Sequence, residues 1–100
     1  MFDRLDDILI RYQQILEELG DPDVVSDQKH FTKLMKEQSD LTPLVDKYKE
    51  YKDAKQTIDD SIEMLEAESD EEMREMLKEE LSQAKSDIDV IEKELKILLI

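Results

Sequence analysis

The side chains that could bind a metal or transfer a proton are mainly carboxylates. Glu63 and Glu66 can share one face of a helix, but no histidine accompanies them. Adjacent residues on a helix point about 100° apart, so neighbouring acids do not converge on one atom. The neighbouring pairs are Asp59/Asp60, Glu71/Glu72 and Glu79/Glu80. We therefore interpret the carboxylates as a solvated acidic surface and predict no metal site.

His30 is the only histidine of the chain. A catalytic triad also needs a serine or cysteine nucleophile and an orienting acid, so we interpret His30 as a partly exposed surface residue. Gly20 is the only glycine, which excludes a glycine-rich phosphate loop, and cysteine is absent, which excludes thiolate sites. We predict that these residues include no catalytic, cofactor-binding or metal-binding site and require no cofactor.

One stretch, KYKEYKDAK at residues 47–55, is both basic and aromatic. Basic residues beside aromatic rings can bind single-stranded nucleic acid. Glu50 and Asp53 interrupt the stretch, however, and the tyrosines could instead pack between helices while lysine stems cover apolar surface. We favour packing of Tyr48 and Tyr51, and contact with nucleic acid or with a protein through these rings stays an alternative.

The formal net charge is −14, and acidic residues outnumber basic residues in every third of the chain. Such a chain is repelled by phosphate backbones and by anionic membranes, so we expect a protein partner and no direct nucleic-acid binding. No apolar run approaches the roughly 20 residues that span a bilayer. The acidic start MFDRLDDILI is unlike a signal peptide, so we expect a cytoplasmic protein.

The composition, with 42% charged residues, one glycine and two prolines, is typical of long helices, so we predict an all-α fold. A first helix is expected at about residues 3–19, with Gly20 as its left-handed cap and Pro22 preventing continuation. Its apolar stripe follows helical spacing. The stripe comprises Phe2, Leu5, Ile8, Leu9, Tyr12, Ile15, Leu16 and Leu19.

A second helix is expected at about residues 27–66, with Ser26 as its N-cap. Pro43 lies in its middle, where it removes one backbone hydrogen bond. The helix either kinks near residues 39–43 or stops and restarts with Thr42 as cap, and we favour a kinked, nearly continuous helix. Packing should be thin at residues 52–57, where Ala54 is the only core candidate.

A third helix is expected at about residues 70–98, and Ser69 with Glu72 fits a capping box at its start. Its apolar residues form a heptad seam. The seam comprises Met73, Leu77, Leu81, Ala84, Ile88, Ile91, Leu95 and Leu98. Because the connection at residues 66–69 is short, the two long helices should be antiparallel. We predict an elongated three-helix antiparallel bundle: a coiled-coil-like hairpin of two long helices plus a shorter N-terminal helix.

Four methionines are expected to cluster around the hairpin: Met35, Met64, Met73 and Met76. We expect them to fill the core rather than to form an adaptable binding groove, which is the alternative use of methionine.

The chain ends on four consecutive apolar residues, Ile97–Ile100. Four such residues point around the whole circumference of a helix and cannot lie on one stripe. We expect that residues 1–100 are the N-terminal domain of a larger protein and that the chain continues into another domain. Burial of this end by dimerisation stays an alternative.

Three stretches in order, LGDPDVVSDQKHFTKLMKEQSDLTPLV (residues 19–45), EEMREMLKEELSQAK (71–85) and LKILLI (95–100), resemble the start of the bacterial peptide chain release factor 1 family. These class I release factors are cytoplasmic, recognise the stop codons UAA and UAG on the ribosome, and promote peptidyl-tRNA hydrolysis. The family's Pro-x-Thr and Gly-Gly-Gln motifs are absent from this sequence. No functional residue can therefore be transferred to it.

The resemblance implies an N-terminal helical domain whose decoding and catalytic domains are absent from these residues. It implies the ribosome as partner, through a stalk-base ribosomal protein, with a translational GTPase and the release factor glutamine methyltransferase as further candidates. We therefore predict a non-catalytic interaction domain of a translation termination factor. The alternative is a stand-alone acidic coiled-coil adaptor or structural protein.

Overall fold

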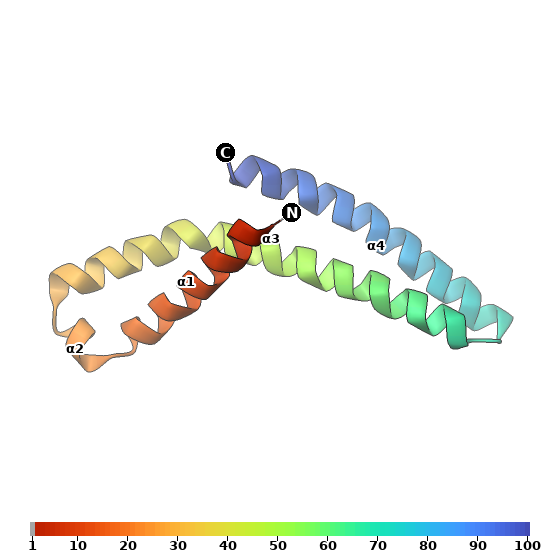
Figure 1. Ribbon diagram of the computed structural model, residues 1–100, viewed down its shortest axis with the longest axis horizontal. Helices are drawn as coiled ribbons and strands as arrows, with labels where there is room; N and C mark the ends of the chain where they lie inside the picture. Colours follow the sequence, from red (N-terminus) through yellow and green to blue (C-terminus); the bar gives the residue numbers. More distant parts are fainter. Residues whose placement is uncertain (1) are drawn as a thin grey trace. The chain divides into compact units, whose positions relative to one another are not determined.

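The computed structural model describes residues 2–100, so Met1, the first residue of the expected domain, lies outside them. All regular secondary structure of these residues is helical (Figure 1). The elements are α1 (Asp3–Leu19), α2 (Pro22–Val25), α3 (Gln28–Ala67) and α4 (Glu71–Leu98). The predicted all-α class with a hairpin of two long helices is confirmed.

The chain forms two compact units, Met1–Asp46 and Lys47–Ile100, called the first and second unit below. Helix α3 contributes its first part to the first unit and its second part to the second unit. In the first unit α1 lies along α3, and the Arg11 guanidinium bonds to the Glu37 carboxylate across the two helices. In the second unit α3 and α4 form the hairpin.

The core of the first unit joins one apolar residue from each of its helices. Ile15 of α1, Val24 of α2 and Leu34 of α3 are buried together, and Leu19 and Leu41 pack against them. Burying side chains of this size stabilises the fold by about 1.5–3 kcal/mol each. The short helix α2 therefore belongs to the core, although no helix was expected at these residues.

Gly20 does not form the predicted left-handed cap. Its backbone is right-handed, with φ −86° and ψ −6°. The Gly20 N–H donates to the Glu17 carbonyl (3.1 Å) and the Asp21 N–H donates to the Glu18 carbonyl (3.0 Å). These two bonds tighten the end of α1 without a left-handed residue, and the chain enters α2 directly.

The short helix α2 has its own caps, and one of them is Ser26, which was expected to begin the second helix. Asp21 caps α2 by accepting a hydrogen bond from the Asp23 N–H (2.9 Å), and Pro22 takes the first helical position, where its missing N–H costs nothing. Ser26 ends α2 rather than beginning α3, since its hydroxyl donates to the Asp23 carbonyl (3.0 Å). At the start of α3, the Asp27 carboxylate instead accepts a hydrogen bond from the His30 N–H (3.2 Å).

Helix α3 continues across Pro43 without a break, so the helix does not stop and restart there. The Pro43 side chain is exposed. One residue earlier, the Thr42 hydroxyl donates to the Gln38 carbonyl (2.7 Å), so its oxygen accepts from the Tyr12 hydroxyl (3.0 Å). This bond fastens α1 to α3 beside the proline. The kink near residues 39–43 stays a prediction.

In the second unit α4 buries Leu77, Ala84 and Leu95, which belong to the predicted heptad seam. Its N-cap is Asp70, whose carboxylate accepts from the Met73 N–H (3.1 Å), so the expected Ser69 cap is wrong by one residue. Helix α3 carries no basic residue in its own last turn. A cation for that end comes instead from α4.

Arg74 supplies this cation, because its Nη1 donates to the carbonyls of Leu65 (2.6 Å) and Glu68 (2.9 Å). The carbonyls at the end of a helix have no partner inside the helix and carry a partial negative charge. A guanidinium there satisfies them and opposes that charge. Arg74 therefore joins the end of α3 to the start of α4 and fixes the connection of the hairpin.

Candidate interaction surfaces

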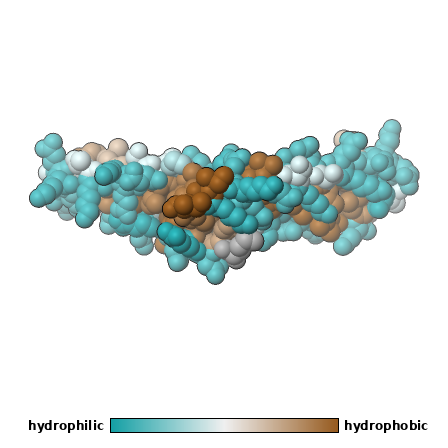
Figure 2. Space-filling model, turned by 90° about the horizontal axis from the view of Figure 1, so that it is seen from above, coloured by the Kyte–Doolittle hydropathy of each residue, from teal (hydrophilic) through white to brown (hydrophobic). Residues whose placement is uncertain are grey.

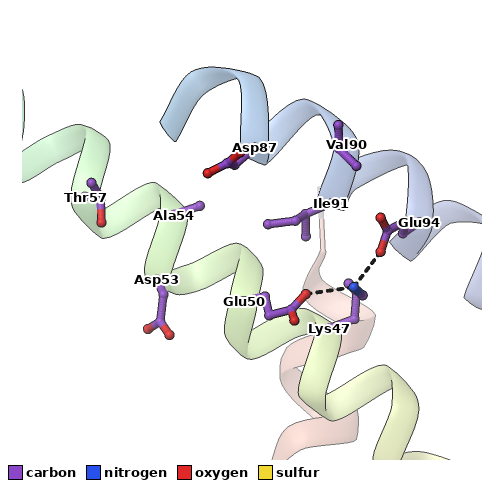
Figure 3. A pocket seen from close by; sticks show the side chains of 9 residues that line it. All are labelled: Lys47, Glu50, Asp53, Ala54, Thr57, Asp87, Val90, Ile91 and Glu94. Carbon is purple, nitrogen blue, oxygen red and sulfur yellow. Dashed lines mark ion pairs between the residues drawn. The ribbon is translucent and has the colours of Figure 1, made fainter. Parts of the chain in front are cut away.

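An open groove of about 490 Å³ lies between α3 and α4 in the second unit (Figure 3). Its lining comprises Lys47, Glu50, Asp53, Ala54, Thr57, Asp87, Val90, Ile91 and Glu94. The apolar side chains among them are Ala54, Val90 and Ile91, while the other residues are polar or charged. The groove is thus an apolar depression with an acidic rim, which suits a ligand that is both apolar and positively charged.

Lys47 closes one end of this groove. Its ammonium lies 2.7 Å from a carboxylate oxygen of Glu50 and 2.5 Å from one of Glu94, so it links the two helices (Figure 3). The hydrogen bonds to Glu50 and Glu94 raise the pKa of Lys47 above its usual value. Lys47 therefore stays charged at physiological pH and neutralises part of the rim.

The groove exists because side chains of α3 are small at this point. Ala54 and Thr57 line the groove from α3, and both belong to residues 52–57, where thin packing was expected. On the other side Ile91 is half-buried, while Val90 remains 53% exposed.

A hollow of about 530 Å³ in the first unit is lined by Arg11, Lys33, Lys36, Glu37 and Asp40. Arg11 Nε and Nη2 donate to the two carboxylate oxygens of Glu37 at 2.8 and 2.7 Å. This hydrogen bonding lowers the pKa of Glu37 and raises the pKa of Arg11. Glu37 and Asp40 offset much of the positive charge that Arg11, Lys33 and Lys36 bring to this hollow.

The four methionines are exposed, so the prediction that they fill the core is wrong. Their exposed fractions run from 43% for Met35 and Met73 to 57% for Met64 and 63% for Met76. Met35 belongs to the first unit, whereas the hairpin belongs to the second unit. Met64 lines a shallow hollow of about 400 Å³ with Asp60, Glu63 and Ala67. The four methionines therefore lie outside the apolar core.

The residues considered for catalysis lie on the surface. His30 is exposed. Its backbone N–H, rather than its imidazole ring, donates a hydrogen bond to the Asp27 carboxylate (3.2 Å). All members of the three acidic pairs are exposed, as are Glu63 and Glu66. Within residues 2–100, no three histidine, cysteine or carboxylate side chains come together as a potential metal site.

The tyrosines of residues 47–55 pack as favoured from the sequence. Tyr48 is buried and Tyr51 is half-buried, and their rings stack with centroids 6.1 Å apart. The Lys52 ammonium lies 4.8 Å from the centre of the Tyr48 ring, within the range of a cation–π interaction. The aromatic rings therefore do not form an open stacking platform for bases.

The last residues of the chain present apolar side chains to solvent. Ile97 is 69% exposed and Leu98 is 41% exposed. Together with Lys47 and Glu94 they line a hollow of about 290 Å³. Burial of this end by dimerisation stays an alternative.

Two features of the second unit were missed from the sequence: the exposure of Val90 and the Arg74 cap. The sequence signal that could have identified the Arg74 cap is an arginine shortly after the short connection between α3 and α4. For Val90 the signal was an apolar residue that lies beside the predicted heptad seam rather than on it.

Most of the visible surface is hydrophilic, with hydrophobic residues gathered in a few patches (Figure 2). None of the helices among the described residues is long and apolar enough to cross a membrane.

The PCRF domain family model matches residues 8–100. Similar proteins include peptide chain release factor 1 of Lachnoclostridium phytofermentans, 59% identical, that of Agathobacter rectalis, 53% identical, and that of Lactococcus lactis subsp. cremoris, 54% identical. Each alignment covers 100% of this chain, and the chain spans 28% of the length of each relative. No solved structure matches. The chain belongs to the PCRF domain family.

Proposed function

We propose that the chain is a non-catalytic interaction domain of a translation termination factor. The observation that carries this proposal is the PCRF match over residues 8–100, together with release factor 1 relatives that align along the whole chain. The complete factor, in this proposal, acts in the cytoplasm, recognises UAA and UAG on the ribosome and promotes hydrolysis of peptidyl-tRNA. Those steps belong to residues outside this chain.

The cations of the two hollows are engaged by carboxylates of the domain itself. The groove of the second unit contains a lysine held by two carboxylates, and the hollow of the first unit contains an arginine held by another. In our proposal the domain contributes binding and positioning, while the rest of the factor supplies the reaction.

We propose the ribosome as the partner, and a basic ribosomal protein at the stalk base as the contact of this domain. The net charge of −14 supports this choice, because a strongly acidic domain is repelled by ribosomal RNA and attracted by basic proteins. The exposed Met64 beside Asp60 and Glu63 offers an adaptable apolar contact with acidic neighbours. A translational GTPase and the glutamine methyltransferase are further proposed partners.

The catalytic part of the proposal is tested with ribosomes halted at a UAA codon and carrying a labelled peptide. The full-length protein should release the peptide, and residues 1–100 alone should leave release at the background rate. A full-length protein that is inactive on UAA and UAG, or a fragment that releases peptide by itself, contradicts the proposal.

The partner is tested by binding the chain to the isolated stalk-base protein and, separately, to ribosomal RNA over a range of salt concentrations. We expect binding to the protein and none to the RNA. Binding to RNA that survives a rise in salt, without binding to the protein, argues against the proposed contact. Asp60→Lys with Glu63→Lys should weaken protein binding, and Asp3→Lys with Asp7→Lys is the matched control in charge.

A further inference from the structure

Helix α4 carries a second heptad stripe beside the one that packs in the hairpin. Its members recur at alternating spacings of three and four residues, as in a coiled-coil seam, and so lie along one side of the helix. They are Met73, Met76, Glu80, Gln83, Asp87, Val90, Glu94 and Ile97. We call this set the outer seam. Its members are exposed apart from Glu94, which is half-buried.

The apolar members of the outer seam are among the most exposed hydrophobic side chains of the protein. Met76 is 63% exposed, Val90 53% and Ile97 69%. Single exposed hydrophobic residues are common and need no explanation. These three, however, are separated by multiples of seven residues, which places them on one line along the helix. They form a line of apolar side chains, interrupted by Gln83, against which a second helix can pack.

The charges of the outer seam specify what can cover it. Glu80, Asp87 and Glu94 are its ionised members, and all three are acidic. Glu94 is neutralised by Lys47, at 2.5 Å, which leaves Glu80 and Asp87 to face a partner. A second copy of this chain would place acid against acid, which is unfavourable. A helix with lysine or arginine opposite these carboxylates would complement them.

We propose that the outer seam of α4 binds a basic amphipathic helix of a partner protein. The groove of about 490 Å³ supports this assignment, because Asp87, Val90 and Glu94 belong to both the seam and the groove lining. A lysine or arginine of the partner can lay its aliphatic stem in the depression beside Ala54 and place its cation at Asp87 (Figure 3). The two-helix hairpin then becomes a three-helix arrangement.

The proposal goes beyond the function proposed above. It depends on the spacing, exposure and charge of α4, and not on the protein in which the domain occurs. Loss of binding at the outer seam and loss of a role in termination can therefore be observed separately.

The probe is a synthetic 28-residue helix with leucine at the two core positions of each heptad and lysine at the flanking positions. A peptide with glutamate in place of every lysine is the control. Binding to residues 1–100 is measured by fluorescence anisotropy at low salt and again at physiological salt. The lysine peptide should bind, more weakly as salt rises, and the glutamate peptide should not.

Two charge reversals on α4 locate the contact. Asp87→Lys should weaken binding of the lysine peptide about tenfold or more, because it places like charges together. Asp89→Lys changes the net charge equally but lies off the seam, at another exposed position of α4. Asp89→Lys should therefore weaken binding of the lysine peptide only by the amount that follows from the reduced net charge of the chain. Asp87 also accepts from Gln83 Nε2 (2.8 Å), so the melting temperature of each variant is recorded.

A filling variant separates binding from stability. Ala54→Leu places a larger side chain in the groove, so it should weaken peptide binding without lowering the melting temperature. Failure of the lysine peptide to bind, or equal losses for Asp87→Lys and Asp89→Lys, overturns the proposal. So does unchanged binding by a folded Ala54→Leu chain. Sedimentation should show a monomer, and a dimer abolished by Val90→Glu would assign the seam to self-association instead.

Discussion

Arg11 and Glu37 are joined by two nearly parallel hydrogen bonds, 2.8 and 2.7 Å long, between a residue of α1 and one 26 positions later in α3. Paired hydrogen bonds of a guanidinium with a carboxylate fix direction as well as distance. This pair and the Tyr12–Thr42 bond set the register of α1 on α3. The apolar cluster around Ile15 then packs in a single arrangement.

Glu37→Gln should lower the free energy of unfolding by about 0.5–1 kcal/mol at neutral pH, because the pair is partly exposed to solvent. The pKa of Glu37 is lowered in the folded state, so its contribution is complete above the ordinary glutamate pKa. The contribution disappears as pH falls through the lowered value. Urea unfolding from pH 7 to pH 3 should therefore show the variant and the wild type converging in acid. Asp40→Asn, which lines the same hollow, serves as control, and a difference that grows in acid contradicts the account.

Pro43→Ala should raise the free energy of unfolding by about 1–3 kcal/mol, because it restores a backbone N–H inside α3 and removes a steric clash. The exposure of Pro43 means that little packing is lost. Chemical denaturation and helical circular dichroism measure the change, with Asp46→Ala as the control at another exposed position of α3. A clear loss of stability would mean that the proline conformation is required for the packing of α3.

Gly20→Ala should be neutral or stabilising by up to about 1 kcal/mol, because the backbone there is right-handed. A methyl group at this position meets the Glu17 carbonyl oxygen at 3.4 Å, an ordinary contact. Thermal melting of Gly20→Ala beside Gly20→Asn measures the effect. Destabilisation of the alanine variant, relieved by asparagine, would indicate the left-handed conformation expected from the sequence.

Arg74→Ala should destabilise the second unit by about 1–2 kcal/mol, since it leaves the Leu65 and Glu68 carbonyls without their charged donor. Arg74→Lys keeps the charge but cannot reproduce the guanidinium geometry, so it should recover only part of the loss. Hydrogen exchange at the end of α3 reports the effect locally. Equal protection in the wild type and in Arg74→Ala would exclude the capping role.

The helices and the hairpin could be predicted from the sequence because their signals are local and repeated. The heptad spacing of Leu77, Ala84 and Leu95 identifies the buried side of α4, and a short connection requires antiparallel helices. The ends of the elements depend on single hydrogen bonds. Asp70 and Asp27 provide the caps in place of the neighbouring serines, Ser69 and Ser26, and the sequence does not decide between adjacent candidates.

The candidate surfaces could be predicted only in part. The small side chain of Ala54 indicated thin packing, and the groove lies there. Apolar character alone cannot show whether Met73, Met76 or Val90 is covered, because coverage depends on how many helices are present on each side. In the second unit two helices pack together, so these side chains stay exposed. The long-range pairs Lys47–Glu94 and Arg11–Glu37 required the register that packing establishes.

The most direct test of the central claim, that the domain supplies binding rather than chemistry, is peptide release by the full-length protein with and without residues 1–100. Release from ribosomes halted at UAA is measured over a range of factor concentrations, with the fold of the shortened protein verified by circular dichroism. We expect the shortened, folded protein to reach the same rate at saturation but to need a higher concentration. A rate at saturation that falls to background, with ribosome binding unchanged, would contradict the account.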